Sequence, residues 1–176
     1  YRKLRNTSRI LVANLYDFAP ATDLVEPDRL EAVDRYALAR FAETVQRIVR
    51  AYDAFDFPAI FQSLNALVTV DLSAFYVDVT KDRMYTFAAK SPGRRSTQTV
   101  MYLMADGLAR LLAPILPVTA DQIWRFLPGP RSASVHLEDF PEVSRFIDPD
   151  LLVKWARMMQ VRDQVNAALE DRRKDK

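Results

Sequence analysis

The longest apolar pattern of the chain lies between Phe57 and Thr86, where two periodicities compete. Alternation of apolar residues fits Val68 to Leu72 but loses its phase at Ser73-Ala74, whereas helical spacing continues without a break. A strand of this length would be unusual, so we expect one long helix that begins directly after Asp56. At about 100° per residue, its buried side forms a stripe roughly 80° wide, made of Phe57, Phe61, Leu64, Val68, Leu72, Phe75 and Val79.

Helical periodicity also governs the rest of the chain. Further helices are expected at residues 1–15, 28–55, 96–113 and 120–127, with a last one starting at Asp148-Pro149. The helix at 28–55 should bury a seam of residues three and four apart, namely Leu38, Phe41, Val45, Ile48, Tyr52 and Phe55. The last helix should bury Leu151, Leu152, Trp155, Met158, Met159, Val165 and Leu169.

Two local signals refine this outline. Gly107 is expected to mark a close helix crossing, and a capping box from Thr119 to Gln122 is expected to begin the helix at 120–127. The whole pattern is typical of an all-α fold, an antiparallel bundle of about five to six helices. Residues 1–147 should form the bundle, and residues 148–176 a C-terminal helix packed on it or leading out of it.

Basic residues are concentrated in two places, although the net charge of the chain is only +2. Residues 1–9 contain no acid, and one face of their helix carries Arg2, Arg5, Asn6 and Arg9. Residues 81–95 carry five basic side chains against one acid, a net charge of +4, and begin with a polar, aromatic tip of the long helix made of Lys81, Asp82, Arg83 and Tyr85. Residues 17–78 carry eleven acids against five Arg, a net charge of −6. Local basic patches attract polyanions. The alternative interpretation of the two basic clusters is an ordinary solvated surface.

Several kinds of chemistry find no support in the sequence. Without Cys and with the single His136, the chain has no disulfide framework and no thiolate zinc site. It has no glycine-rich phosphate loop and no nucleophile elbow. Asp71 lies in an apolar stretch and is expected to pair with a cation, Arg5 or Arg110. By itself, the chain does not resemble a complete enzyme.

The setting of the chain is also an expectation from sequence. No apolar run approaches the roughly 20 residues that a membrane helix needs, so we expect no membrane association and a cytoplasmic location. The chain opens on a helical, basic segment and stops in the charged run Glu170 to Lys176. We therefore expect it to be a fragment of something longer.

Five segments resemble, in this order, the anticodon-binding region of class I isoleucyl-tRNA synthetases: YRKLRNTSRILVANL, DRYALARF, VDLSAFYVDVTKDRMYT, RRSTQTVMYLMADGLARLLAPILPVTADQIW and SVHLEDFP. They cover about residues 1–20, 34–42 and 65–141, and the closing WARMMQVRDQVNAALEDRR is also similar to that family. The third and fourth segments are the more specific ones. They favour the isoleucine enzyme over its valine, leucine and methionine relatives, which share the helical fold.

The resemblance implies a helical bundle that follows a Rossmann catalytic core and docks on the stem and anticodon loop of isoleucine tRNA. It places near the anticodon Arg2, Arg5, Asn6 and Arg9 of the first helix, and Lys81, Asp82, Arg83 and Tyr85 of the tip. Arg and Lys neutralise phosphates, while Asn and Arg can read base edges. A Tyr can stack on an unpaired base. In a bundle, the two clusters share one end only if the first helix and the long helix run antiparallel.

The HIGH and KMSKS motifs, the editing domain and the cysteine-rich zinc module of that family are absent from this sequence. The resemblance therefore implies no cofactor and no catalysis in this fragment. ATP, magnesium and, in many relatives, zinc belong to other parts of the ligase, and the catalytic domain of the same chain is an expected partner. Two alternatives stay open: a helical scaffold or protein-interaction domain, and the equivalent domain of a valyl- or methionyl-tRNA synthetase.

Overall fold

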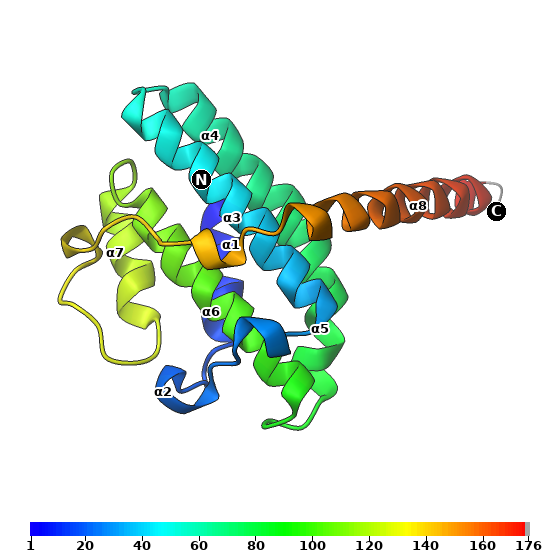
Figure 1. Ribbon diagram of the computed structural model, residues 1–176, viewed down its shortest axis with the longest axis horizontal. Helices are drawn as coiled ribbons and strands as arrows, with labels where there is room; N and C mark the ends of the chain where they lie inside the picture. Colours follow the sequence, from blue (N-terminus) through cyan, green and yellow to red (C-terminus); the bar gives the residue numbers. More distant parts are fainter. Residues whose placement is uncertain (175–176) are drawn as a thin grey trace.

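The computed structural model describes residues 1–174, and these residues form helices and loops without any strand. The prediction of an all-α fold is therefore confirmed (Figure 1). In chain order the elements are α1 (Arg2–Ala13), α2 (Pro20–Asp23), the 3₁₀ turn η1 (Pro27–Arg29), α3 (Ala32–Asp53), α4 (Phe57–Ala66), the π-helical segment η2 (Leu67–Tyr76), α5 (Val77–Thr86), α6 (Pro92–Leu112), α7 (Pro117–Phe126), the 3₁₀ turns η3 (Val135–Leu137) and η4 (Ser144–Phe146), and α8 (Pro149–Lys174).

The predicted long helix exists as one continuous helix from Phe57 to Thr86, formed by α4, η2 and α5. Asp56 caps it, because its Oδ1 accepts a hydrogen bond of 3.1 Å from the backbone N–H of Ala59. The predicted buried stripe is wrong at both ends, since Phe57, Phe61 and Val79 are 54 %, 68 % and 42 % exposed.

The π-helical segment explains this error. Buried positions recur along the helix every four residues, at Ile60, Leu64, Val68, Leu72, Tyr76, Thr80 and Met84. In an α-helix of 3.6 residues per turn, each such step would turn away from the core by about 40°. A π-helix bonds residue i to i+5 and so places more residues in each turn. The segment Leu67–Tyr76 therefore brings these positions back toward the core, which a purely α-helical period does not anticipate.

Helices α3 and α6 pack against each other and against the long helix. At their crossing, a Cβ on Gly107 would lie 2.7 Å from Cζ of Phe41, which confirms the predicted close approach. The Tyr52 hydroxyl on α3 donates a hydrogen bond of 2.7 Å to the carbonyl of Leu111. Of the predicted seam on α3, Phe55 is wrong: it follows the end of the helix, has a φ of 54° and is 79 % exposed.

Helix α1 runs parallel to the long helix. The Thr7 hydroxyl lies 2.8 Å from that of Ser73 in η2. Further along, Asp17 binds Arg94, and the Nε of Arg94 donates to the carbonyl of Met84 near the end of α5. The two helices therefore run in the same direction. The antiparallel arrangement of the first helix and the long helix that was considered from the sequence is not found.

Helix α7 packs beside α1 and α6. Its residue Trp124 contacts the loop that follows the helix. Trp124 is buried, and the guanidinium groups of Arg110 and Arg131 lie over its ring, 5.2 and 4.5 Å from the ring centroid. Its Nε1 donates a hydrogen bond to the carbonyl of Ser132. The predicted capping box is wrong, because α7 begins earlier, at Pro117. The Thr119 hydroxyl instead lies 3.3 Å from that of Tyr1.

Helix α8 leaves the bundle after one contact region (Figure 1). The predicted cap is confirmed, since Oδ1 of Asp148 accepts from the N–H of Leu151 at 2.9 Å. Trp155 stacks on Tyr36 of α3, with ring centroids 4.5 Å apart. Of the residues predicted to be buried here, none is fully buried in the structure. The prediction is wrong outright for Met158, Val165 and Leu169, which are at least half exposed. The later part of α8 projects away from the bundle (Figure 1).

The expectation that no apolar segment approaches the length of a membrane helix is wrong. By length and composition alone, the helix Phe57–Thr86 passes that test, with an 18-residue window of mean hydropathy 1.3. The core helix of a soluble protein can have the same length and composition, and 44 % of this window is buried inside the bundle.

Candidate nucleic-acid interface

The polar face of α1 is exposed to solvent. Thr7, Ser8 and Leu11 point into the bundle, which leaves the opposite side of the helix exposed. That exposed side carries Arg2, Arg5, Asn6 and Arg9. In the part of the chain that the structure describes, no carboxylate lies within 4.0 Å of any of these three guanidinium groups. The positive charge of this face is therefore available to an anionic partner.

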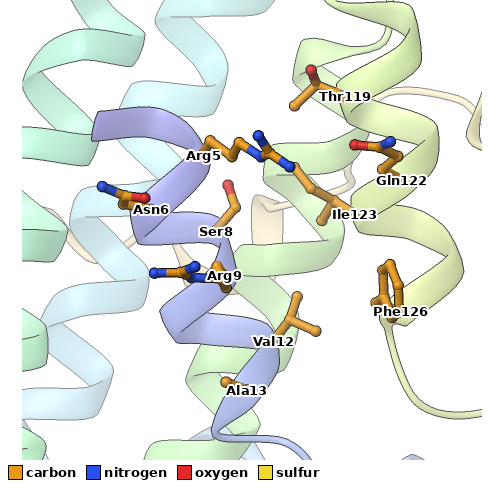
Figure 2. Close-up of a pocket in the computed structure, with 10 residues that line it drawn as sticks. All are labelled: Arg5, Asn6, Ser8, Arg9, Val12, Ala13, Thr119, Gln122, Ile123 and Phe126. Atoms are coloured by element: carbon orange, nitrogen blue, oxygen red, sulfur yellow. The ribbon is translucent and has the colours of Figure 1, made fainter. Parts of the chain in front are cut away.

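A groove of about 470 Å³ separates this helix from α7 (Figure 2). Its walls contain two basic residues, two amides, two hydroxyls and four apolar side chains, and no acid: Arg5, Asn6, Ser8, Arg9, Val12, Ala13, Thr119, Gln122, Ile123 and Phe126. In Figure 2, the Arg5 side chain extends from α1 toward α7, and Gln122 extends back toward it. In the same view, the side chains of Asn6 and Arg9 extend from α1 to the side away from α7.

The sequence pattern does not indicate the α7 side of this groove. It predicts that Thr119 and Gln122 form a capping box, and it assigns no role to Phe126. One signal could have found it: Phe126 follows Ile123 and Trp124 at a position outside the apolar stripe of its helix. The structure leaves it 75 % exposed.

The tip of the long helix is divided between solvent and core. Lys81, Asp82 and Tyr85 are exposed, Tyr85 to 72 %. Lys81 donates a hydrogen bond of 2.9 Å to Asp78 one turn earlier, and this bond raises the pKa of the lysine. Arg83 differs from these three, because its Nη1 turns inward and lies 3.2 Å from Oδ2 of Asp34.

Asp34 is the centre of a buried polar cluster that ties three helices together. Its side chain is fully buried and accepts hydrogen bonds from Tyr76 Oη at 2.7 Å, from Ser96 Oγ at 2.5 Å and from Arg83. Burial raises the pKa of Asp34, while the three donors oppose that shift. Arg83 therefore has a structural partner, which the sequence alone did not reveal.

The two predicted clusters do not meet at one end of the bundle. Since Thr7 lies beside Ser73, the basic face of α1 lies level with the middle of the long helix. The tip begins eight residues later, at Lys81, which is about 12 Å further along a helix that rises about 1.5 Å per residue. A ligand that touches both clusters must therefore be extended along the bundle.

Two other predicted residues are placed as follows. Asp71 pairs with an arginine as expected, but the partner is Arg40 at 3.5 Å and not Arg5 or Arg110. Burial raises the pKa of Asp71, and Arg40 opposes the shift.

His136 is exposed in a 3₁₀ turn. Among residues 1–174, no three side chains of His, Cys, Asp and Glu are grouped as metal ligands.

The fold and the acid-free groove together define a helical-bundle module with a surface for a polyanion. Residues 34–176 match the model of one protein family, described as "Anticodon-binding domain of tRNA ligase". The chain belongs to this family. The match begins within α3, so α1 lies outside it.

Curated relatives extend the similarity over the whole chain. The chain is 45 % identical over 177 aligned residues to an isoleucine–tRNA ligase of Natranaerobius thermophilus, and equally identical to that of Halalkalibacterium halodurans. It is 46 % identical to an isoleucine–tRNA ligase of Moorella thermoacetica, with 99 % of the chain covered. The chain spans about 19 % of the length of these relatives.

Proposed function

We propose that this chain binds the anticodon stem-loop of isoleucine tRNA as part of an isoleucine–tRNA ligase. The observation that carries the proposal is the acid-free basic face of α1, which borders the groove to α7. An exposed row of unpaired guanidinium groups is suited to a phosphate backbone. The relatives that align with the full chain are isoleucine–tRNA ligases, which supports the choice of isoleucine.

The residues have different roles in this proposal. Arg2, Arg5 and Arg9 neutralise phosphates, and Asn6 offers an amide to a base edge. Lys81 and Tyr85 of the exposed tip contact the same RNA further along the bundle, with Asp82 beside them. The role of Arg83 is chiefly to pair with Asp34.

The proposal assigns catalysis to other parts of the ligase. Attachment of isoleucine, with its ATP and magnesium, belongs to a catalytic domain of the same polypeptide, and the location is cytoplasmic. This chain then contributes the affinity and specificity for the anticodon.

The proposal predicts that binding depends on the anticodon. Isoleucine tRNA whose anticodon is exchanged for that of valine or methionine tRNA should bind the chain about 5- to 150-fold more weakly, because each base contact contributes about 1–3 kcal/mol. Fluorescence anisotropy at one fixed salt concentration measures the difference. Equal affinity for the three RNAs would exclude anticodon recognition, and a preference for an exchanged anticodon would reassign the amino acid.

A second prediction concerns Arg5. Arg5→Gln should weaken binding about tenfold near 0.1 M salt and reduce the slope of log K against log salt by about 0.7–0.9, the value for one lost phosphate contact. The matched control is Arg50→Gln, an exposed arginine on α3, which contributes nothing to the groove. If both variants retain the salt slope of the unmodified chain, Arg5 does not contact a phosphate.

A protein-interaction role is the second candidate, and one observation favours it. Phe55, Phe57 and Phe61 are 79 %, 54 % and 68 % exposed around the turn between α3 and α4. Exposed aromatic side chains that lie close together are typical of contact surfaces. In that case the chain would show no salt-dependent tRNA binding in the two experiments above.

A further inference from the structure

The groove between α1 and α7 has the size and composition of a binding site for one small planar group. Its volume of about 470 Å³ lies within the range of about 300–1,000 Å³ that small-molecule sites occupy. Four apolar side chains, Val12 and Ile123 among them, line it together with six polar or charged ones, so the groove offers both apolar contact and polar groups that can fix the orientation of a ligand.

Phe126 supplies an aromatic face at this groove. It is the last residue of α7, and 75 % of its surface remains exposed. No other aromatic ring among the described residues stacks on it. A free aromatic face next to cationic side chains is the arrangement on which an unpaired base stacks.

Arg5 and Gln122 supply charge and a base-reading group from opposite walls. In Figure 2 the two side chains extend toward each other across the groove. A guanidinium binds phosphate oxygens, and a glutamine amide can both donate to and accept from a base edge. With no carboxylate in the lining, nothing in the groove repels a phosphate.

We propose that the groove between α1 and α7 holds one unstacked nucleotide of single-stranded RNA. The base stacks on Phe126, Gln122 contacts its edge, and Arg5 binds an adjacent phosphate. This inference rests on the proposed function and extends it, because it adds α7 to the interface and limits the occupant to a nucleotide that has left the helical stack.

Photocrosslinking with the 176-residue chain tests the placement. The probe is an anticodon stem-loop RNA of isoleucine tRNA with 5-iodouridine at one loop position at a time, since this base couples on irradiation to an aromatic ring stacked on it. At one loop position, the crosslink should map to the peptide that contains Phe126, and Phe126→Ala should abolish it. A crosslink found solely on other peptides contradicts the proposal.

Affinity gives the second readout. Phe126→Ala should weaken RNA binding about 5- to 150-fold with an unchanged salt slope, because stacking of one base contributes about 1–3 kcal/mol. Phe126→Trp should retain binding. The matched control is Phe61→Ala, which removes a ring of similar exposure, 68 %, from α4.

The outcomes separate this inference from the proposed function. If the unmodified chain binds the RNA and discriminates the anticodon, but Phe126→Ala behaves like Phe61→Ala, the function stands and the nucleotide site is refuted. If the unmodified chain does not bind the RNA at all, both are refuted. Loss of binding in Phe126→Ala and retention in Phe126→Trp and Phe61→Ala support the site.

Discussion

Replacing Asp34 with Ala is expected to lower the free energy of unfolding by about 3–5 kcal/mol, the usual cost of removing one partner from a buried ion pair. Asp34 is fully buried and accepts hydrogen bonds from Tyr76, Ser96 and Arg83. Without it, the buried hydroxyl of Tyr76 and the inward-turned guanidinium of Arg83 lose their shared acceptor. Urea denaturation followed by circular dichroism measures the change.

Two further variants show whether the cluster is responsible. Tyr76→Phe removes one donor and leaves the ion pair, so it should cost about 1–2 kcal/mol. Asp53→Ala removes an exposed carboxylate at the end of the same helix and should change stability by less than about 0.5 kcal/mol. If Asp34→Ala is no more destabilising than Asp53→Ala, the cluster does not stabilise the bundle.

The second large effect is expected at Asp17. Asp17→Asn should lower the free energy of unfolding at neutral pH by about 2–3 kcal/mol. Both oxygens of Asp17 accept from Arg94, at 2.6 and 3.0 Å, and Gln98 donates to it at 2.7 Å. The Arg94 side chain is 3 % exposed, so solvent cannot replace the lost carboxylate.

This effect should depend on pH in a defined direction. The hydrogen bond from Arg94 holds the pKa of Asp17 below its ordinary value of 3.8, although burial opposes the shift. A carboxyl with a lowered pKa in the folded state stabilises the protein above its unfolded pKa, and this contribution is lost as the pH falls through the folded pKa. The difference between the unmodified chain and Asp17→Asn should therefore shrink below about pH 4. A difference in the free energy of unfolding between the two proteins that stays constant from pH 7 to pH 3 would contradict this pH dependence.

The Asp34 cluster affects how RNA-binding experiments at the tip are interpreted. Arg83→Ala leaves Asp34 buried without its cation, so a loss of RNA binding in that variant can come from a disturbed fold. Lys81 and Tyr85 are exposed and are better probes of the tip. Lys81 pairs with Asp78 on its own helix, and such an exposed pair contributes little to stability.

The sequence by itself determined the helices, their approximate ends and the core of α3 and α6. Apolar side chains repeat with a period near 3.6, and this repeat is a local property that survives in any packing arrangement. The cap at Asp56, the cap at Asp148 and the close crossing at Gly107 were also predictable, because each depends on neighbouring residues or on the absence of a side chain. The exposed basic face of α1 followed from the same period.

The tertiary structure alone decided which residues meet. A π-helical segment shifted the buried side of the long helix, so Phe57, Phe61 and Val79 became exposed. Partners of charged groups depend on contacts distant in sequence, which is why Arg83 and Asp71 pair with residues of α3 that no local pattern indicates. The parallel course of α1 and the groove opposite Phe126 likewise arise from packing, since helical period specifies a buried face but not the helix that covers it.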